Sequence, residues 1–200
     1  MGSEMCIRDR AGDTIGIVTD IQGNRRFEVT VIGEAAHSGT TTRARRKDAF
    51  IAATDIATAL RRHFADNDPQ DIARFTIGIF DVQPGAKSIV PGRVDFFIDF
   101  RHPSAETLKV LGDDIAVIAK AGQGPCTATV REVSSAAPDA FSTAVIDRVA
   151  TAADRHGYAS QRMISGAGHD ARYLLRMCPT GMVFIPVSYT HLTLPTICSV

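Results

Sequence analysis

Four short segments of this 200-residue chain carry side chains that could act on a ligand. The first is the Gly-, Ser- and Thr-rich stretch 33–41, which follows a predicted strand and contains His37. An imidazole can donate or accept a proton near neutral pH, and loops anchored on rigid strands often carry ligand-contacting residues. His37 is therefore a candidate functional residue, and a solvated or helix-capping histidine is the alternative.

The second and third segments flank a predicted strand. Arg101 lies at its end, where a guanidinium can bind a carboxylate in bidentate fashion; an ordinary surface salt bridge is the alternative. Ser88 opens the segment Ser-Ile-Val-Pro-Gly at 88–92, before that strand. Its proline and glycine are typical of a hairpin turn and need no further explanation.

The fourth segment is Ser-Gly-Ala-Gly-His-Asp at 165–170, where small residues precede His169 at the start of a predicted helix. Glycines such as Gly168 allow close backbone approach, and the free N–H groups of a helix N-terminus favour an anionic ligand. Plain helix capping is the alternative. The segment is not a nucleotide fingerprint, because GxGxxG and Walker patterns are absent.

The elements around these segments predict an α+β fold. Alternating apolar residues indicate half-buried strands, and apolar stripes at three- and four-residue spacing indicate helices. Ser104 suits an N-cap position. The order β-α-β-β-α-β predicts a ferredoxin-like domain over about 22–135; its elements are expected at 26–33, 48–64, 74–82, 94–101, 104–122 and 126–133.

A partial α/β segment is expected after a linker at 136–139. It comprises helices at 140–156 and 168–177, a strand at 158–163 and a buried strand at 181–186. Residues 1–10 and 188–200 match neither the periodicity nor the composition of their neighbours, and both resemble translated sequencing-adapter sequence. We therefore expect a natural segment of 11–187 that excludes Cys6, His191 and Cys198; a natural C-terminal strand carrying a functional His191 is the alternative.

Composition excludes several classes of protein. Lys plus Arg and Asp plus Glu both number 22, so the basic excess of a nucleic-acid binder is missing. No apolar run is long enough to cross a bilayer and no signal-peptide core is present. We expect a cytoplasmic protein without membrane or nucleic-acid partners. The four cysteines lack CxxC spacing, which argues against a disulfide framework or a cysteine zinc site.

The motifs together resemble the metal-dependent amidase branch of the M20 peptidase family. This branch contains N-carbamoyl-L-amino-acid hydrolases, allantoate amidohydrolases and β-ureidopropionase. The resemblance covers nearly all of 11–186, and its motifs are IGIVTDIQG at 15–23, AHSGTT at 36–41 with RKDA at 46–49, IVPGR at 89–93 with DFRHP at 99–103, and MISGAGHDA at 163–171.

The resemblance implies an α/β catalytic domain with two zinc or manganese ions, interrupted by a ferredoxin-like lid through which two subunits dimerise. Residues 11–21 and 136–187 would belong to the catalytic domain, and 22–135 to the lid. The resemblance implies that His37 reaches the partner's active site and polarises the scissile carbonyl. It implies that Arg101 binds the substrate carboxylate and that Gly168 and His169 contact the substrate.

Two departures put the substrate in question. Ser88 stands where the family usually has a substrate-binding asparagine, and Thr42-Arg43 replaces the usual Pro-Met. The family's metal ligands and glutamate base fall outside this chain's matching segments, so no metal-binding residue is predicted here. We expect the isolated chain to be inactive, without the metal pair. An M20 aminoacylase or peptidase is the near alternative; a non-catalytic ferredoxin-like module for dimerisation or small-ligand binding is the distant one.

Overall fold

The computed structural model describes residues 15–185. The chain divides into two compact units, one formed by Gln22–Asp139 and the other by the segments before and after it. The adapter-like ends predicted at 1–10 and 188–200, with Cys6, His191 and Cys198, lie outside the described residues. Within the described part, no helix is long and apolar enough to cross a membrane.

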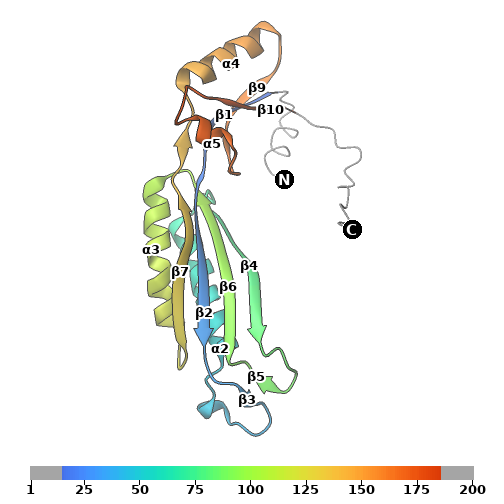
Figure 1. Ribbon diagram of the computed structural model, residues 1–200, viewed down its shortest axis with the longest axis vertical. Helices are drawn as coiled ribbons and strands as arrows, with labels where there is room; N and C mark the ends of the chain where they lie inside the picture. Colours follow the sequence, from blue (N-terminus) through green and yellow to red (C-terminus); the bar gives the residue numbers. More distant parts are fainter. Residues whose placement is uncertain (1–14, 186–200) are drawn as a thin grey trace. The chain divides into compact units, whose positions relative to one another are not determined.

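The larger unit is a four-stranded antiparallel sheet with two helices (Figure 1). Its sheet order, β4-β6-β2-β7, is that of a ferredoxin-like sandwich. The α+β prediction is confirmed. The elements, in chain order, are β2 (Gly23–Ile32), β3 (Ala36–His37), the 3-10 helix η1 (Arg43–Arg45), α2 (Ala49–Asn67), β4 (Arg74–Gln83), β5 (Ile89–Val90), β6 (Arg93–His102), α3 (Ala105–Gly122) and β7 (Thr127–Ala136).

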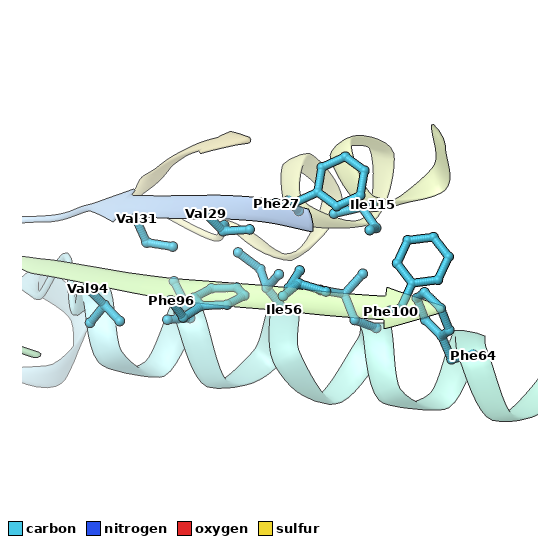
Figure 2. Close-up of a cluster of buried hydrophobic side chains, with 14 of the residues drawn as sticks. Phe27, Val29, Val31, Ile56, Phe64, Val94, Phe96, Phe100 and Ile115 are labelled. Atoms are coloured by element: carbon cyan, nitrogen blue, oxygen red, sulfur yellow. The ribbon is translucent and has the colours of Figure 1, made fainter. Parts of the chain in front are cut away.

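Strand alternation builds the core of this unit. Every second residue of β6 is buried, from Val94 to His102, and those between face the other side of the sheet. The buried side chains of β2 and β6 meet those of α2 and α3 (Figure 2). Phe64 of α2 lies edge-on to Phe100 with ring centroids 4.9 Å apart, a favourable aromatic geometry. One face of the sheet is therefore packed and the other is open to polar residues.

Both long helices begin at side-chain caps. The Asp48 carboxylate accepts hydrogen bonds from the Phe50 and Ile51 amides at 3.0 and 3.2 Å. The Ser104 hydroxyl accepts one from the Thr107 amide at 3.2 Å, which confirms the predicted N-cap. These bonds satisfy amides that have no partner inside the helix.

The smaller unit is a short mixed sheet with one helix. Strand β1 (Ile15–Ile21) pairs in parallel with β9 (Ser160–Ser165) and antiparallel with β10 (Met182–Phe184), and the two-residue β8 (Asp139–Ala140) also joins this sheet. Helix α4 (Thr143–Arg155) packs its buried Ile146 against this sheet. The predicted α/β character of this part of the chain is present.

Two predictions for this unit need correction. The helix expected at 168–177 is reduced to a single turn, α5 (Ala171–Leu174). The following residues form turns before Pro179, which has no amide hydrogen to continue a helix. The strand expected to be buried at 181–186 contributes only β10 to the described structure, and Val183 is 40% exposed. Among the described strands, β10 lies at the edge of its sheet, where one side is not covered by a further strand.

Candidate functional site

A small second sheet joins two segments that the sequence suggested only as separate loops. Strand β3 pairs with β5, so that His37 lies opposite Ile89. The Ser38 amide also donates to the Ser88 carbonyl at 2.9 Å. Strands β3 and β5 lie at one end of the larger unit (Figure 1). His37 and Ser88 are therefore neighbours at that end, and both are exposed to solvent. We call this end, residues 33–48 with 83–93, the tip.

Two glycines hold the tip's backbone segments in close contact. The Gly33 amide donates to the Gly92 carbonyl at 2.8 Å, and the Glu34 amide donates to the Lys47 carbonyl at 2.8 Å. A Cβ at Gly33 would overlap the Lys47 carbonyl, and one at Gly92 would lie 2.8 Å from the Ala35 nitrogen. Only glycine fits at these two close backbone approaches. The loop that carries His37 therefore begins at a tightly held backbone segment.

The His37 ring has one fixed hydrogen bond. The Gly39 amide donates to His37 Nδ1 at 3.1 Å. A backbone amide is always a donor, so this nitrogen is the acceptor. The ring is exposed at the tip, where it can reach a ligand that is not part of this unit.

Arg101 lies at the opposite end of the same sheet, on the face away from the buried Phe100. Its Nε and Nη2 donate to the two carboxylate oxygens of Asp99, both at 3.3 Å. Asp99 also accepts from Arg26 Nε at 3.0 Å. The Asp99 side chain is 19% exposed and that of Arg101 31%, so Asp99 orients a guanidinium that solvent can still reach.

The ionisation of Asp99 follows from these contacts. Burial by itself raises the pKa of the Asp99 carboxyl, but the hydrogen bonds and charges of Arg101 and Arg26 outweigh burial and hold that pKa below its ordinary value. Asp99 is therefore a carboxylate at neutral pH. The stability that it contributes is present above the ordinary aspartate pKa and is lost as the pH falls through the lowered pKa.

The strand register separates His37 from Arg101. Ile32, which precedes the tip, pairs with Arg93, whereas Asn24 pairs with Arg101. Arg93 and Arg101 are eight positions apart in β6, or roughly 26 Å at the rise of a strand residue. The two residues cannot contact one small substrate within a single copy of this unit.

Gly168 and His169 belong to the smaller unit. His169 Nε2 lies 3.1 Å from the buried Ser165 hydroxyl, and its ring centroid lies 5.8 Å from that of Phe184. These contacts orient the imidazole. Gly168 is exposed, and a Cβ there would meet open space. The one-turn helix that follows does not supply the N-terminal anion site that the sequence suggested.

Two residues that hold the candidates in place, Asp99 and Arg46, were not predicted to do so from the sequence. Asp99 stands two positions before Arg101, and residues two apart in a strand share a face, so that pairing could have been predicted. Arg46 donates to the Ser38 and Thr41 carbonyls in the loop that carries His37. Side-chain contacts with loop carbonyls leave no pattern in a sequence.

The described residues do not form a binding site for the two metal ions that the family resemblance implies. Among residues 15–185, no three His, Cys, Asp or Glu side chains gather into a group that could hold a metal ion.

Comparison with known proteins agrees with the family resemblance of the sequence motifs. The family model of peptidase family M20/M25/M40 matches residues 10–195. The chain is 36% identical over 174 residues to an N-carbamoyl-L-amino-acid amidohydrolase of Paenarthrobacter aurescens, covering 86% of this chain and 42% of that protein. It is 33% identical over 183 residues to an allantoate amidohydrolase of Bacillus subtilis, covering 89% and 43% respectively.

Solved structures agree with the fold. A hydantoinase/carbamoylase-family amidase of Burkholderia multivorans superposes with a TM-score of 0.78 and 38% sequence identity, covering 90% of this chain and 44% of that one. The chain thus spans less than half the length of these relatives. Its family match extends over most of its own length, through both units. The chain belongs to peptidase family M20/M25/M40.

Proposed function

We propose that the complete protein is an amidohydrolase that cleaves a C–N bond of N-carbamoyl amino acids or related ureido compounds. Residues 22–135 would be its lid and dimerisation domain, and 11–21 with 136–187 would be parts of its catalytic domain. The observation that carries the proposal is the exposed His37, held on a glycine-built tip within a chain that resembles carbamoylases and allantoate amidohydrolases. The cytoplasmic location stays a prediction.

The proposed chemistry assigns a distinct task to each residue. His37 would donate a hydrogen bond from Nε2 to the scissile carbonyl oxygen, which gains negative charge in the transition state. Arg101, oriented by Asp99, would bind the substrate carboxylate. Ser88, Gly168 and His169 would contact the rest of the substrate. Two divalent ions, zinc or manganese, are part of the proposal, with ligands outside residues 15–185.

The distance between His37 and Arg101 requires two copies of the chain. Arg93, at the tip end of β6, lies roughly 26 Å from Arg101 by strand register, and His37 lies within the tip. One small substrate can therefore contact both His37 and Arg101 only if they come from different subunits. We therefore propose a homodimer in which each active site combines Arg101 of one subunit with the partner subunit's His37. In this arrangement, the exposure of His37 allows its side chain to enter the partner subunit's active site.

One side of the larger unit suits a second copy of itself. Among the described strands, β4 is an edge strand, so one side of its backbone has no strand partner in that part of the chain. Its Ile79 is 60% exposed and pairs with Phe97, on the open face of the sheet. Its Phe80 stacks on Phe96 and packs edge-on against Phe50 of α2, on the helix face. We call this apolar edge, Ile79 with Phe80, the edge patch. Arg74 and Asp81 lie toward opposite ends of β4, so antiparallel pairing of two copies brings opposite charges together.

The edge patch gives a direct prediction for the 200-residue chain. Ile79→Lys should convert a dimer into a monomer, because it places a charge on an apolar edge strand. Val133→Lys, on the other edge strand β7 and 44% exposed in the wild type, is the matched control and should remain dimeric. Light scattering coupled to size-exclusion chromatography measures the masses. A monomeric wild-type chain, or dimer loss only with Val133→Lys, would refute this interface.

The proposed activity is tested by comparing the isolated chain with the complete enzyme. We expect the purified 200-residue chain to release no ammonia from N-carbamoyl amino acids or allantoate, and to contain no stoichiometric zinc or manganese. The complete enzyme should hydrolyse at least one of these compounds and lose activity with a chelator. Metal analysis that finds about two zinc ions per isolated chain would contradict the proposal that this chain lacks the metal ligands.

A further inference from the structure

We infer that Gly39 and Arg46 are positioning residues for His37: Gly39 fixes the tautomer of the imidazole, and Arg46 fixes the loop that presents it. The inference deepens the proposed function, because it rests on His37 acting as a hydrogen-bond donor. Neither residue touches the substrate in this scheme. Both act through backbone groups and the ring of His37.

The tautomer follows from a single contact. The Gly39 amide donates to His37 Nδ1 at 3.1 Å, so Nδ1 must present its lone pair. In a neutral imidazole the proton then lies on Nε2. His37 is thus prepared to donate a hydrogen bond from Nε2. The opposite tautomer would set two N–H groups against each other.

Glycine at position 39 leaves room for this contact. A Cβ there would lie 3.2 Å from His37 Cε1, closer than most such contacts, and 3.4 Å from Nδ1, an ordinary van der Waals distance. Because the ring is exposed, it would yield by turning away, and the hydrogen bond to the Gly39 amide would be lost. We therefore expect Gly39→Ala to let the His37 ring exchange between its two tautomers, without disturbing the core.

Arg46 ties the two sides of the loop together. Its Nη2 donates to the Ser38 carbonyl at 2.6 Å, and its Nε donates to the Thr41 carbonyl at 3.0 Å. The Thr41 amide in turn donates to the His37 carbonyl at 3.1 Å. The loop is closed around Gly39 by these bonds, so the amide that meets His37 has a fixed direction. Charge-assisted bonds of this kind are stronger than neutral ones.

Neighbouring arginines provide a matched control. Arg43 and Arg45 are the first and last residues of η1, which ends directly before Arg46, and both are exposed. Within the described residues, neither side chain makes a hydrogen bond or ion pair to the loop. If positive charge near the tip were the only property that mattered, Arg43→Gln and Arg46→Gln would behave alike. If the loop geometry matters, only Arg46→Gln should have an effect.

The tautomer is measured directly in the 200-residue chain by long-range ¹H–¹⁵N NMR at about pH 8, where an ordinary imidazole is neutral. We expect His37 in the wild type and in Arg43→Gln to show a lone-pair Nδ1 and a protonated Nε2. Gly39→Ala and Arg46→Gln should show averaged tautomers. His102 is an internal reference, because its Nδ1 accepts from the Ser104 amide at 2.9 Å and should stay unchanged in every variant.

Kinetics of the complete enzyme then separate this inference from the proposed function. Arg46→Gln should lower kcat about 10-fold to 100-fold with a smaller change in KM, Arg46→Lys should recover part of the loss, and Arg43→Gln should be neutral. A protonated Nδ1 in the wild type, or averaging equal to that in Gly39→Ala, would overturn the inference whatever the activity. A fixed tautomer with full activity in His37→Ala would instead overturn the proposed role of His37.

Discussion

Replacing His37 by alanine in the complete enzyme should lower kcat by about 10²-fold to 10³-fold, the usual loss when one oxyanion hydrogen-bond donor is removed. KM should change much less, because the bond strengthens only as charge develops on the carbonyl oxygen. The fold should be unaffected, since His37 is exposed and its side chain makes a single hydrogen bond within residues 15–185, with the Gly39 amide. Steady-state kinetics with an N-carbamoyl amino acid measure both constants.

An exposed histidine of the smaller unit serves as the control for this variant. His156 follows α4 and is exposed, and His156→Asn should leave kcat within about twofold, as is usual for surface substitutions. Glutamine at position 37 should recover part of the activity, because an amide can still donate. An unchanged kcat in His37→Ala, with the tip intact, would remove His37 from the mechanism.

The second large effect is expected at Arg101. Arg101→Gln should lower kcat/KM for a carboxylate substrate by roughly 30-fold to 1,000-fold, mainly through KM. This loss corresponds to about 2 to 4 kcal/mol of transition-state stabilisation. The reason is the loss of a bidentate, charge-assisted contact that Asp99 holds in position. A methyl ester of the same substrate lacks the carboxylate charge, so its poorer turnover should fall much less. Kinetics with the acid and the ester give the comparison.

Arg26 offers the matched control for Arg101. It binds the same Asp99 carboxylate at 3.0 Å, and its side chain is 41% exposed. Arg26→Gln removes a positive charge from the same face, yet the contacts between Asp99 and Arg101 remain. We expect a change below about fivefold, in line with an exposed ion pair. Equal losses in Arg26→Gln and Arg101→Gln would mean that general charge, and not a clamp, attracts the substrate.

The main elements of the larger unit were predictable because their local and tertiary signals agree. Asp48 and Ser104 are good N-caps, and both helices begin directly after them. The buried residues of β6 alternate as the sequence does, so its core face was predictable too. The helix after Gly168 was overestimated, because its apolar pattern continues through residues that form turns before Pro179.

The arrangement of the site was less predictable than its residue types. Strands β3 and β5 have two residues each, too few for any periodicity, yet they bring His37 beside Ser88. The separation of His37 from Arg101 depends on strand register, which the chain pattern does not reveal when the residues lie in different elements. The same holds for Arg46, whose partners are backbone carbonyls.

The most direct test of the account is to mix two impaired forms of the complete enzyme, His37→Ala and Arg101→Gln, under conditions that exchange subunits, and to assay the mixture at a substrate concentration well below the KM of either form. If each active site combines Arg101 of one subunit with the partner's His37, one site of every mixed dimer has both residues. A one-to-one mixture should then regain about one quarter of wild-type activity, because half of the dimers are mixed and one of their two sites is complete. No recovery despite proven subunit exchange would contradict the shared active site and, with it, the central role assigned to the tip.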